Sequence, residues 1–170
     1  LSGGLFTALG MGYFVFLPVE ASFFLYVLPA LSLFSIGFGL FVPALTKTAL
    51  AVSEKHSGFA SGLNNAVSRF SSLIFIAVIS ILLTFSYQNN LERNLSDQDF
   101  SEVTIATIKN QSDKLLDIKT ESFENRDLLE EQIKKSFVDS LNTVALISLI
   151  VILISLTGTH LLLNEDKIKD

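Results

Sequence analysis

The sequence contains no cysteine and no tryptophan, and only three prolines and one methionine in 170 residues. Without cysteine, neither a disulfide framework nor a thiolate metal site can form, and the redox compartment cannot be inferred. Charged residues make up 17% of the chain, against roughly 25% in an ordinary soluble domain. The net charge of −5 argues against the basic face that nucleic-acid binding requires. We therefore expect no nucleic-acid partner.

Catalytic motifs are also missing. The sequence has no G-x-S-x-G, no P-loop, no H-E-x-x-H and no Gly-rich dinucleotide turn. His56 has no second histidine or cysteine nearby, so we interpret it as a solvated loop residue and not as a metal ligand. We therefore expect that the chain is not an enzyme and that it binds no cofactor or metal. If the protein moves solutes, we expect that this piece does not hydrolyse ATP, although a separate subunit could.

What the sequence does have is long apolar segments, and 49% of its residues are hydrophobic. A helix that crosses a bilayer needs about 20 predominantly apolar residues. The sequence therefore predicts an all-α polytopic membrane protein with four transmembrane helices, at residues 1–17, 23–44, 59–85 and 137–163, followed by a polar tail at 164–170. Its main partner would be the lipid bilayer.

A charged insertion, residues 87–136, separates the third and fourth predicted spans. It lacks glycine and proline, so it need not be a floppy linker. Leu129, Ile133 and Phe137 recur every four residues, which predicts an amphipathic helix that runs into the last span. We therefore expect the insertion to be partly helical and to lie outside the membrane.

The chain begins Leu-Ser-Gly-Gly, without an initiator methionine or the charged start of a signal peptide. We interpret it as the C-terminal piece of a longer membrane protein. Upstream helices of the same protein would then be partners of these four.

A polar stretch opens the third predicted span. Ser61, Asn65, Ser68 and Ser72 share one helical face, and Arg69 lies four residues after Asn65. An ionisable residue near hydrocarbon is costly and usually has a partner or a water-filled path. Arg69 has three interpretations: it snorkels to water or lipid phosphate, it bridges to a neighbouring span as a gate latch, or it contacts substrate.

The second predicted span carries small residues and proline at Gly37, Gly39 and Pro43. A proline inside a helix removes a backbone hydrogen bond, and glycines reduce side-chain bulk. These three residues therefore form either a hinge for a rocking motion or a site of close helix packing.

Both motifs together resemble a known family. The pattern Gly37-x-Gly39-x-x-x-Pro43, followed by Gly58-x-Ala60-Ser61-Gly62-x-x-Asn65-x-x-x-Arg69, is similar to the C-terminal region of major facilitator superfamily transporters, and most similar to the fourteen-helix drug:proton antiporters. The resemblance covers nearly the whole chain except residues 87–136. One departure is that Ser71 and Ser72 stand where that branch often has glycines.

The resemblance implies a function. The chain would contribute to proton-coupled efflux of small amphipathic compounds by alternating access, in the plasma (inner) membrane. Gly58, Ser61, Gly62, Asn65 and Arg69 would form the cytoplasmic, gating end of the third helix. Residues 44–57 and the tail would face the cytoplasm and residues 87–136 the outside. Lysine and arginine near the membrane do not decide this orientation, because both sides carry them.

Proton coupling requires a titratable group in the membrane path. Residues 23–44, 59–85 and 145–163 contain no aspartate or glutamate. Asp139 lies at the edge of the last span, where we interpret it as solvating the helix start. The sequence therefore predicts that the coupling carboxylate lies upstream of Leu1.

A different class of function is also open. The chain could be a membrane-anchored sensor or assembly protein whose insertion, residues 87–136, binds a partner. About 50 residues without cysteine are marginal for an independently stable domain.

Overall fold

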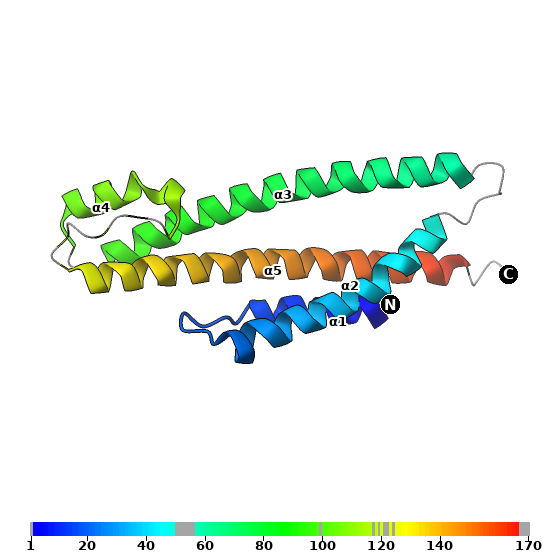
Figure 1. Cartoon of the computed structure of the whole chain (residues 1–170), viewed down its shortest axis with the longest axis horizontal. Helices are drawn as coiled ribbons and strands as arrows, with labels where there is room; N and C mark the ends of the chain where they lie inside the picture. Colours follow the sequence, from blue (N-terminus) through cyan, green and yellow to red (C-terminus); the bar gives the residue numbers. More distant parts are fainter. Residues whose placement is uncertain are drawn as a thin grey trace.

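The computed structural model describes residues 2–49, 57–98, 100–116, 118, 120, 123 and 125–166, and its regular structure there is helical, with no strand (Figure 1). His56 and the end of the tail lie outside the described residues. The elements are α1 (Ser2–Phe14), a π-helical turn η1 (Phe23–Val27), α2 (Leu28–Ala49), α3 (Ser57–Ser96), α4 (Glu102–Lys109), a 3-10 turn η3 (Ser112–Lys114) and α5 (Arg126–Asp166).

Three helices of the described chain are long and apolar enough to cross a membrane: Phe23–Ala44, Gly58–Ser96 and Arg126–Leu161. The first predicted span corresponds to α1, which has 13 residues and ends at Phe14. Such a helix rises only about 20 Å, less than the hydrocarbon core of about 30 Å. The all-α class is therefore confirmed, with three helices compatible with membrane spans, whereas the count of four spans is not.

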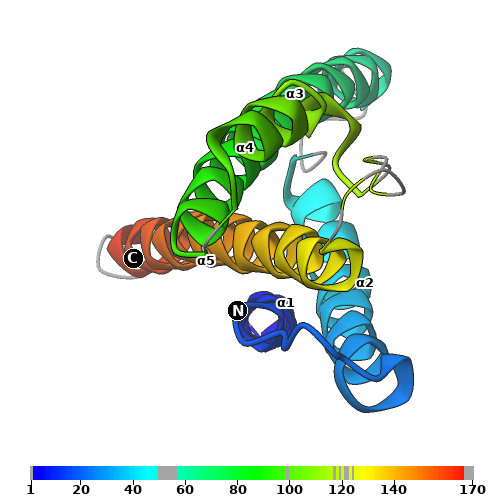
Figure 2. The same ribbon diagram turned by 90° about the vertical axis from the view of Figure 1, so that its left-hand side faces the viewer.

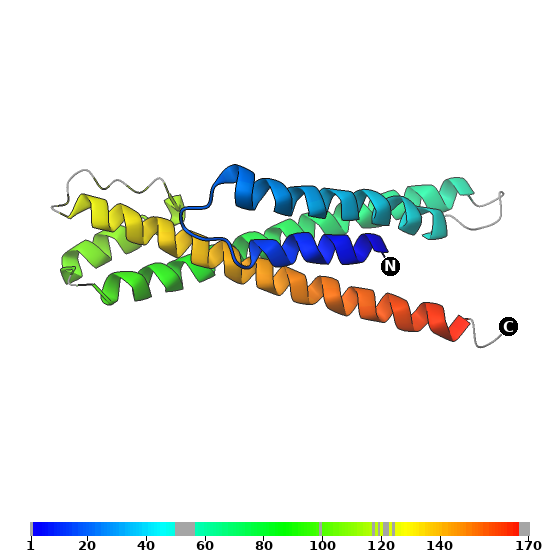
Figure 3. The same ribbon diagram turned by 90° about the horizontal axis from the view of Figure 1, so that it is seen from below.

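The helices α1 and α2 form a close antiparallel hairpin, visible side by side in Figure 3. Glycines make this approach possible. A Cβ atom on Gly37 would clash with the backbone nitrogen of Thr7, and one on Gly10 would lie 2.5 Å from the backbone nitrogen of Phe34. No larger residue fits at either position unless the helices move apart.

The helices α3 and α5 are single, uninterrupted helices of 40 and 41 residues. At 1.5 Å per residue each is about 60 Å long, twice the hydrocarbon thickness. Their excess length continues into the charged insertion, and we call the described part of residues 87–136 the head. Figures 1 and 2 show the two helices together at the head and further apart at the opposite end.

The head has a hydrophobic core of its own. Its buried residues come from α3, α4, α5 and the segment between α4 and α5: Tyr87, Leu91, Leu95, Ile108, Ile118, Leu129 and Ile133. The Tyr87 hydroxyl also donates a hydrogen bond of 2.9 Å to the Leu115 carbonyl. The repeat of Leu129, Ile133 and Phe137 lies within α5, where the first two residues are buried and Phe137 packs against them.

A polar ladder joins α3 to α5 where the head meets the membrane segments. Asn94 Nδ2 donates to Ser136 Oγ at 2.9 Å, and Asn90 Nδ2 donates to Ser140 Oγ at 3.0 Å. Both serines are fully buried. A shift of one helix along the other would break both of these hydrogen bonds, so the ladder favours one register of the pair.

Candidate functional site

The membrane-level part of the structure contains an apolar cavity of about 330 Å³ between α1, α2, α3 and α5. Four aromatic rings and two hydroxyls define its wall: Phe34, Phe38, Phe41, Phe75, Ser148 and Ser155. On the α1 side, Gly4 brings the backbone close to the cavity. Ligand sites in proteins have volumes of about 300–1,000 Å³ and mostly apolar walls with a few polar groups, and this cavity fits that description.

The aromatic wall follows from the sequence of α2. Phe34, Phe38 and Phe41 have the i, i+4, i+7 spacing of one helical face. The rings of Phe34 and Phe38 are stacked, with centroids 6.1 Å apart and planes at 10°. The fourth ring, Phe75, reaches the cavity from the middle of α3.

Ionisable groups are absent from the described lining of this cavity. The Thr7 hydroxyl, which also lines it, donates to the Gly3 carbonyl at 3.0 Å, so its proton is engaged within α1. The cavity therefore offers stacking and dispersion contacts and few hydrogen bonds. Its chemistry suits the apolar or aromatic part of a small molecule.

None of the residues proposed from the motif of α3 lines this cavity. Ser61 is half-buried, whereas Asn65 and Arg69 are exposed. Nothing lies within 4 Å of a Cβ atom built on Gly58 or Gly62. In the described residues, the start of α3 is thus free of close packing, and its gating role stays a prediction.

The three residues of the α2 motif separate in the structure. Gly37 is buried in the crossing with α1, whereas a Cβ atom on Gly39 would meet no atom within 4 Å. Pro43 lies inside α2, and the helix continues past it to Ala49. The structure therefore gives Gly37 a packing role, and the hinge role of Gly39 and Pro43 stays a prediction.

No protein-family model, no curated protein and no solved structure matches this chain.

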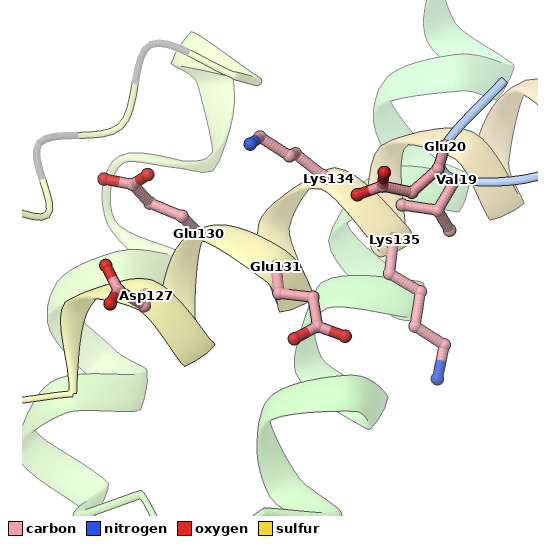
Figure 4. Close-up of a pocket in the computed structure, with 7 residues that line it drawn as sticks. All are labelled: Val19, Glu20, Asp127, Glu130, Glu131, Lys134 and Lys135. Atoms are coloured by element: carbon pink, nitrogen blue, oxygen red, sulfur yellow. The ribbon is translucent and has the colours of Figure 1, made fainter. Parts of the chain in front are cut away.

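A second hollow, of about 390 Å³, lies at the base of the head (Figure 4). The loop before η1 contributes Val19 and Glu20, and the first turns of α5 contribute charged side chains: Asp127, Glu130, Glu131, Lys134 and Lys135. Figure 4 shows Glu130 and Lys134 on one flank of α5, with Glu131 and Lys135 on another. Unlike the first cavity, this hollow is lined mostly by charged side chains.

Glu130 has defined partners in this region. Arg126 Nε donates to its carboxylate at 2.7 Å, and Thr120 Oγ1 donates at 2.9 Å. These two hydrogen bonds hold the pKa of Glu130 below its ordinary value. The carboxylate is therefore ionised near neutral pH and is suited to structure and charge recognition, not to proton transfer.

Among the side chains that the structure describes, no group of three or more histidine, aspartate or glutamate residues could hold a metal ion. Asp139 is half-buried at the head side of α5, and its carbonyl accepts a hydrogen bond of 2.9 Å from the Thr143 hydroxyl.

The aromatic cavity was not predicted from the sequence. The spacing of the three α2 phenylalanines was the available signal for it.

Proposed function

We propose that this chain forms part of the helical wall of a major facilitator-type transporter, which moves small amphipathic compounds across a membrane by alternating access in exchange for protons. Its helices would be the last four of that protein. The observation that carries the proposal is the apolar cavity walled by Phe34, Phe38, Phe41 and Phe75, at the level of helices able to span a membrane. The motif resemblance in α2 and α3 adds support.

The cavity supports transport because its walls come from separate helices. α2 supplies three rings, α3 one ring and α5 two serines. Alternating access works when helices that share a binding site move against each other. The membrane half of α3 contacts little of the described chain, and no residue in its most apolar window is buried. A change in its position would alter the cavity without breaking a packed core.

Replacing Phe38 with alanine in the full-length protein should impair efflux of a fluorescent amphipathic dye. The change removes a stacked ring that is worth roughly 1 kcal/mol, so we expect about a fivefold loss in kcat/KM. Efflux from loaded cells would be measured at equal protein abundance. Phe85→Ala is the matched control, because Phe85 is 63% exposed on α3 and does not line the cavity. Equal efflux by both variants would remove the cavity from the proposal.

The head supports a second candidate, a membrane-anchored protein that binds a partner outside the bilayer. Its buried core provides a stable platform, and the hollow at its base combines acidic and basic side chains. A photo-crosslinking residue in place of Glu131 should then yield one discrete protein adduct in intact cells. The same experiment in a protein that also carries Lys134→Glu should yield no such adduct. A residue at Phe85 should yield none. An equal adduct yield with and without Lys134→Glu would argue against this candidate.

A further inference from the structure

Arg69 is a solvent-exposed arginine on a helix long and apolar enough to cross a membrane. No aspartate or glutamate occurs in residues 23–49, 57–85 or 145–161, and the first acidic residues of α5 beyond them are Glu165 and Asp166. The ion pairs of the described residues, Lys109–Glu92 and Arg126–Glu130, both lie in the head. A charge on such a helix needs a counter-charge or water, and these segments supply no counter-charge.

The polar ladder gives the depth of Arg69. Asn90 of α3 bonds to Ser140 of α5, and the two helices are antiparallel. Arg69 precedes Asn90 by 90 − 69 = 21 residues, and the same number of residues along α5 from Ser140 ends at Leu161. Because helical side chains lean toward the N-terminus, the match is good to about one turn. Arg69 is therefore level with residues 157–161, close to the end of the apolar segment of α5.

Two further basic side chains lie at this end of the molecule. His160 is exposed on α5 at the same level. Gly4 of α1 contacts Leu156 of α5, and the neighbouring Gly3 contacts Phe41 of α2, so Phe41 and Leu156 lie at a similar level. Lys47 is exposed and follows Phe41 by six residues on α2. It therefore lies beyond that level, toward the end of the molecule opposite the head. Figure 1 shows the start of α3 and the ends of α2 and α5 at the same end of the molecule, opposite the head.

The immediate surroundings of Arg69 are an open hollow of about 420 Å³, lined by Ser68, Arg69, Ser72 and Leu73. Toward the membrane centre the same face continues with Leu73 and Ile76, which are 68% and 62% exposed. The site thus has a cation and a hydroxyl at the membrane edge and an apolar strip below them. An amphipathic anion with its charge at the edge and its chains in the hydrocarbon matches this arrangement.

We propose that Arg69, with Ser68, binds the headgroup phosphate of an anionic phospholipid, whose acyl chains lie along Leu73 and Ile76. A guanidinium donates two parallel hydrogen bonds to phosphate, and arginine near a helix end reaches the membrane interface by snorkelling. The leaflet opposite the head is then the anionic one. Since anionic lipids concentrate on the cytoplasmic side, the head lies outside, as the motif resemblance also implies.

The test uses the full-length protein in detergent, with native mass spectrometry to count bound phosphatidylglycerol as that lipid is titrated. Arg69→Gln should weaken binding roughly tenfold, as expected for the loss of a charge-assisted bidentate contact. Arg69→Lys keeps the charge but not the bidentate geometry, and should give an intermediate affinity. Arg93→Gln is the control, because it removes an exposed arginine of the head. Phosphatidylcholine should bind wild type and all variants equally weakly.

Three results would overturn the proposal. Equal phosphatidylglycerol binding by wild type and Arg69→Gln would mean that Arg69 does not contact the lipid. Displacement of the lipid by millimolar inorganic phosphate would mean that the site recognises a free anion and not a phospholipid. A lower unfolding temperature for Arg69→Gln in pure phosphatidylcholine, where no anionic lipid is present, would mean that Arg69 is instead paired with protein. Because none of these measurements uses transport, they stand independently of the proposed function.

Discussion

Replacing Gly37 with alanine should destabilise the α1–α2 hairpin by about 1–3 kcal/mol, the usual cost of forcing an extra methyl group into a packed contact. The added Cβ atom would meet the backbone and hydroxyl of Thr7 and the carbonyl of Gly3. Backbone atoms cannot move aside as a flexible side chain can, so α1 must shift away from α2. The unfolding temperature of the full-length protein in detergent would measure the loss.

Gly39→Ala is the matched control for this change, two residues away on the same helix. A Cβ atom there meets no atom within 4 Å, so the stability should be unchanged or slightly higher, since alanine favours helix more than glycine does. The chain has no cysteine, so pairs of introduced cysteines in α1 and α2 can report the separation directly. Equal unfolding temperatures for the Gly37 and Gly39 variants would contradict the close crossing.

Replacing Leu129 with alanine should destabilise the head by about 2–5 kcal/mol, because it deletes a fully buried side chain and leaves a cavity. Hydrogen exchange of the amides in α4 and in the last turns of α3 should accelerate, since these elements share the core with Leu129. Mass-spectrometric detection of exchange in the full-length protein resolves the head from the membrane segments.

The neighbouring residue provides the control. Leu128 is 38% exposed on the same turn of α5, so Leu128→Ala should change exchange in the head far less. The membrane segments should exchange alike in both variants. If Leu129→Ala accelerated exchange no more than Leu128→Ala, the head would lack the core described above.

The membrane helices were predictable because their signal is local. The apolar segments of α2, α3 and α5 are recognisable from their length and composition. The four-residue repeat of Leu129, Ile133 and Phe137 predicted that α5 extends into the insertion. The first span was overestimated: the chain leaves the helix after Phe14, ahead of Pro18, whose ring disfavours a helical conformation at the residue before it.

The candidate sites were harder to predict from the sequence, because they depend on contacts between residues far apart in the chain. Phe34, Phe38 and Phe41 share a face that the sequence alone reveals, but the approach of Phe75 depends on how α3 lies against α2 and α5. Likewise, no local pattern pairs Asn94 with Ser136 across 42 residues. Gly37 and Gly39 look alike in sequence, and only the crossing with α1 separates them.

The unbroken course of α3 and α5 has a practical consequence. Between Leu63 and Ser96, and between Arg126 and Thr157, neither helix contains a glycine or a proline that would let it bend at the membrane surface. The head is therefore rigidly continuous with the two apolar helices, and any tilt of the pair turns the head through the same angle. A fluorophore on α4 would therefore report tilting of the apolar segments of α3 and α5.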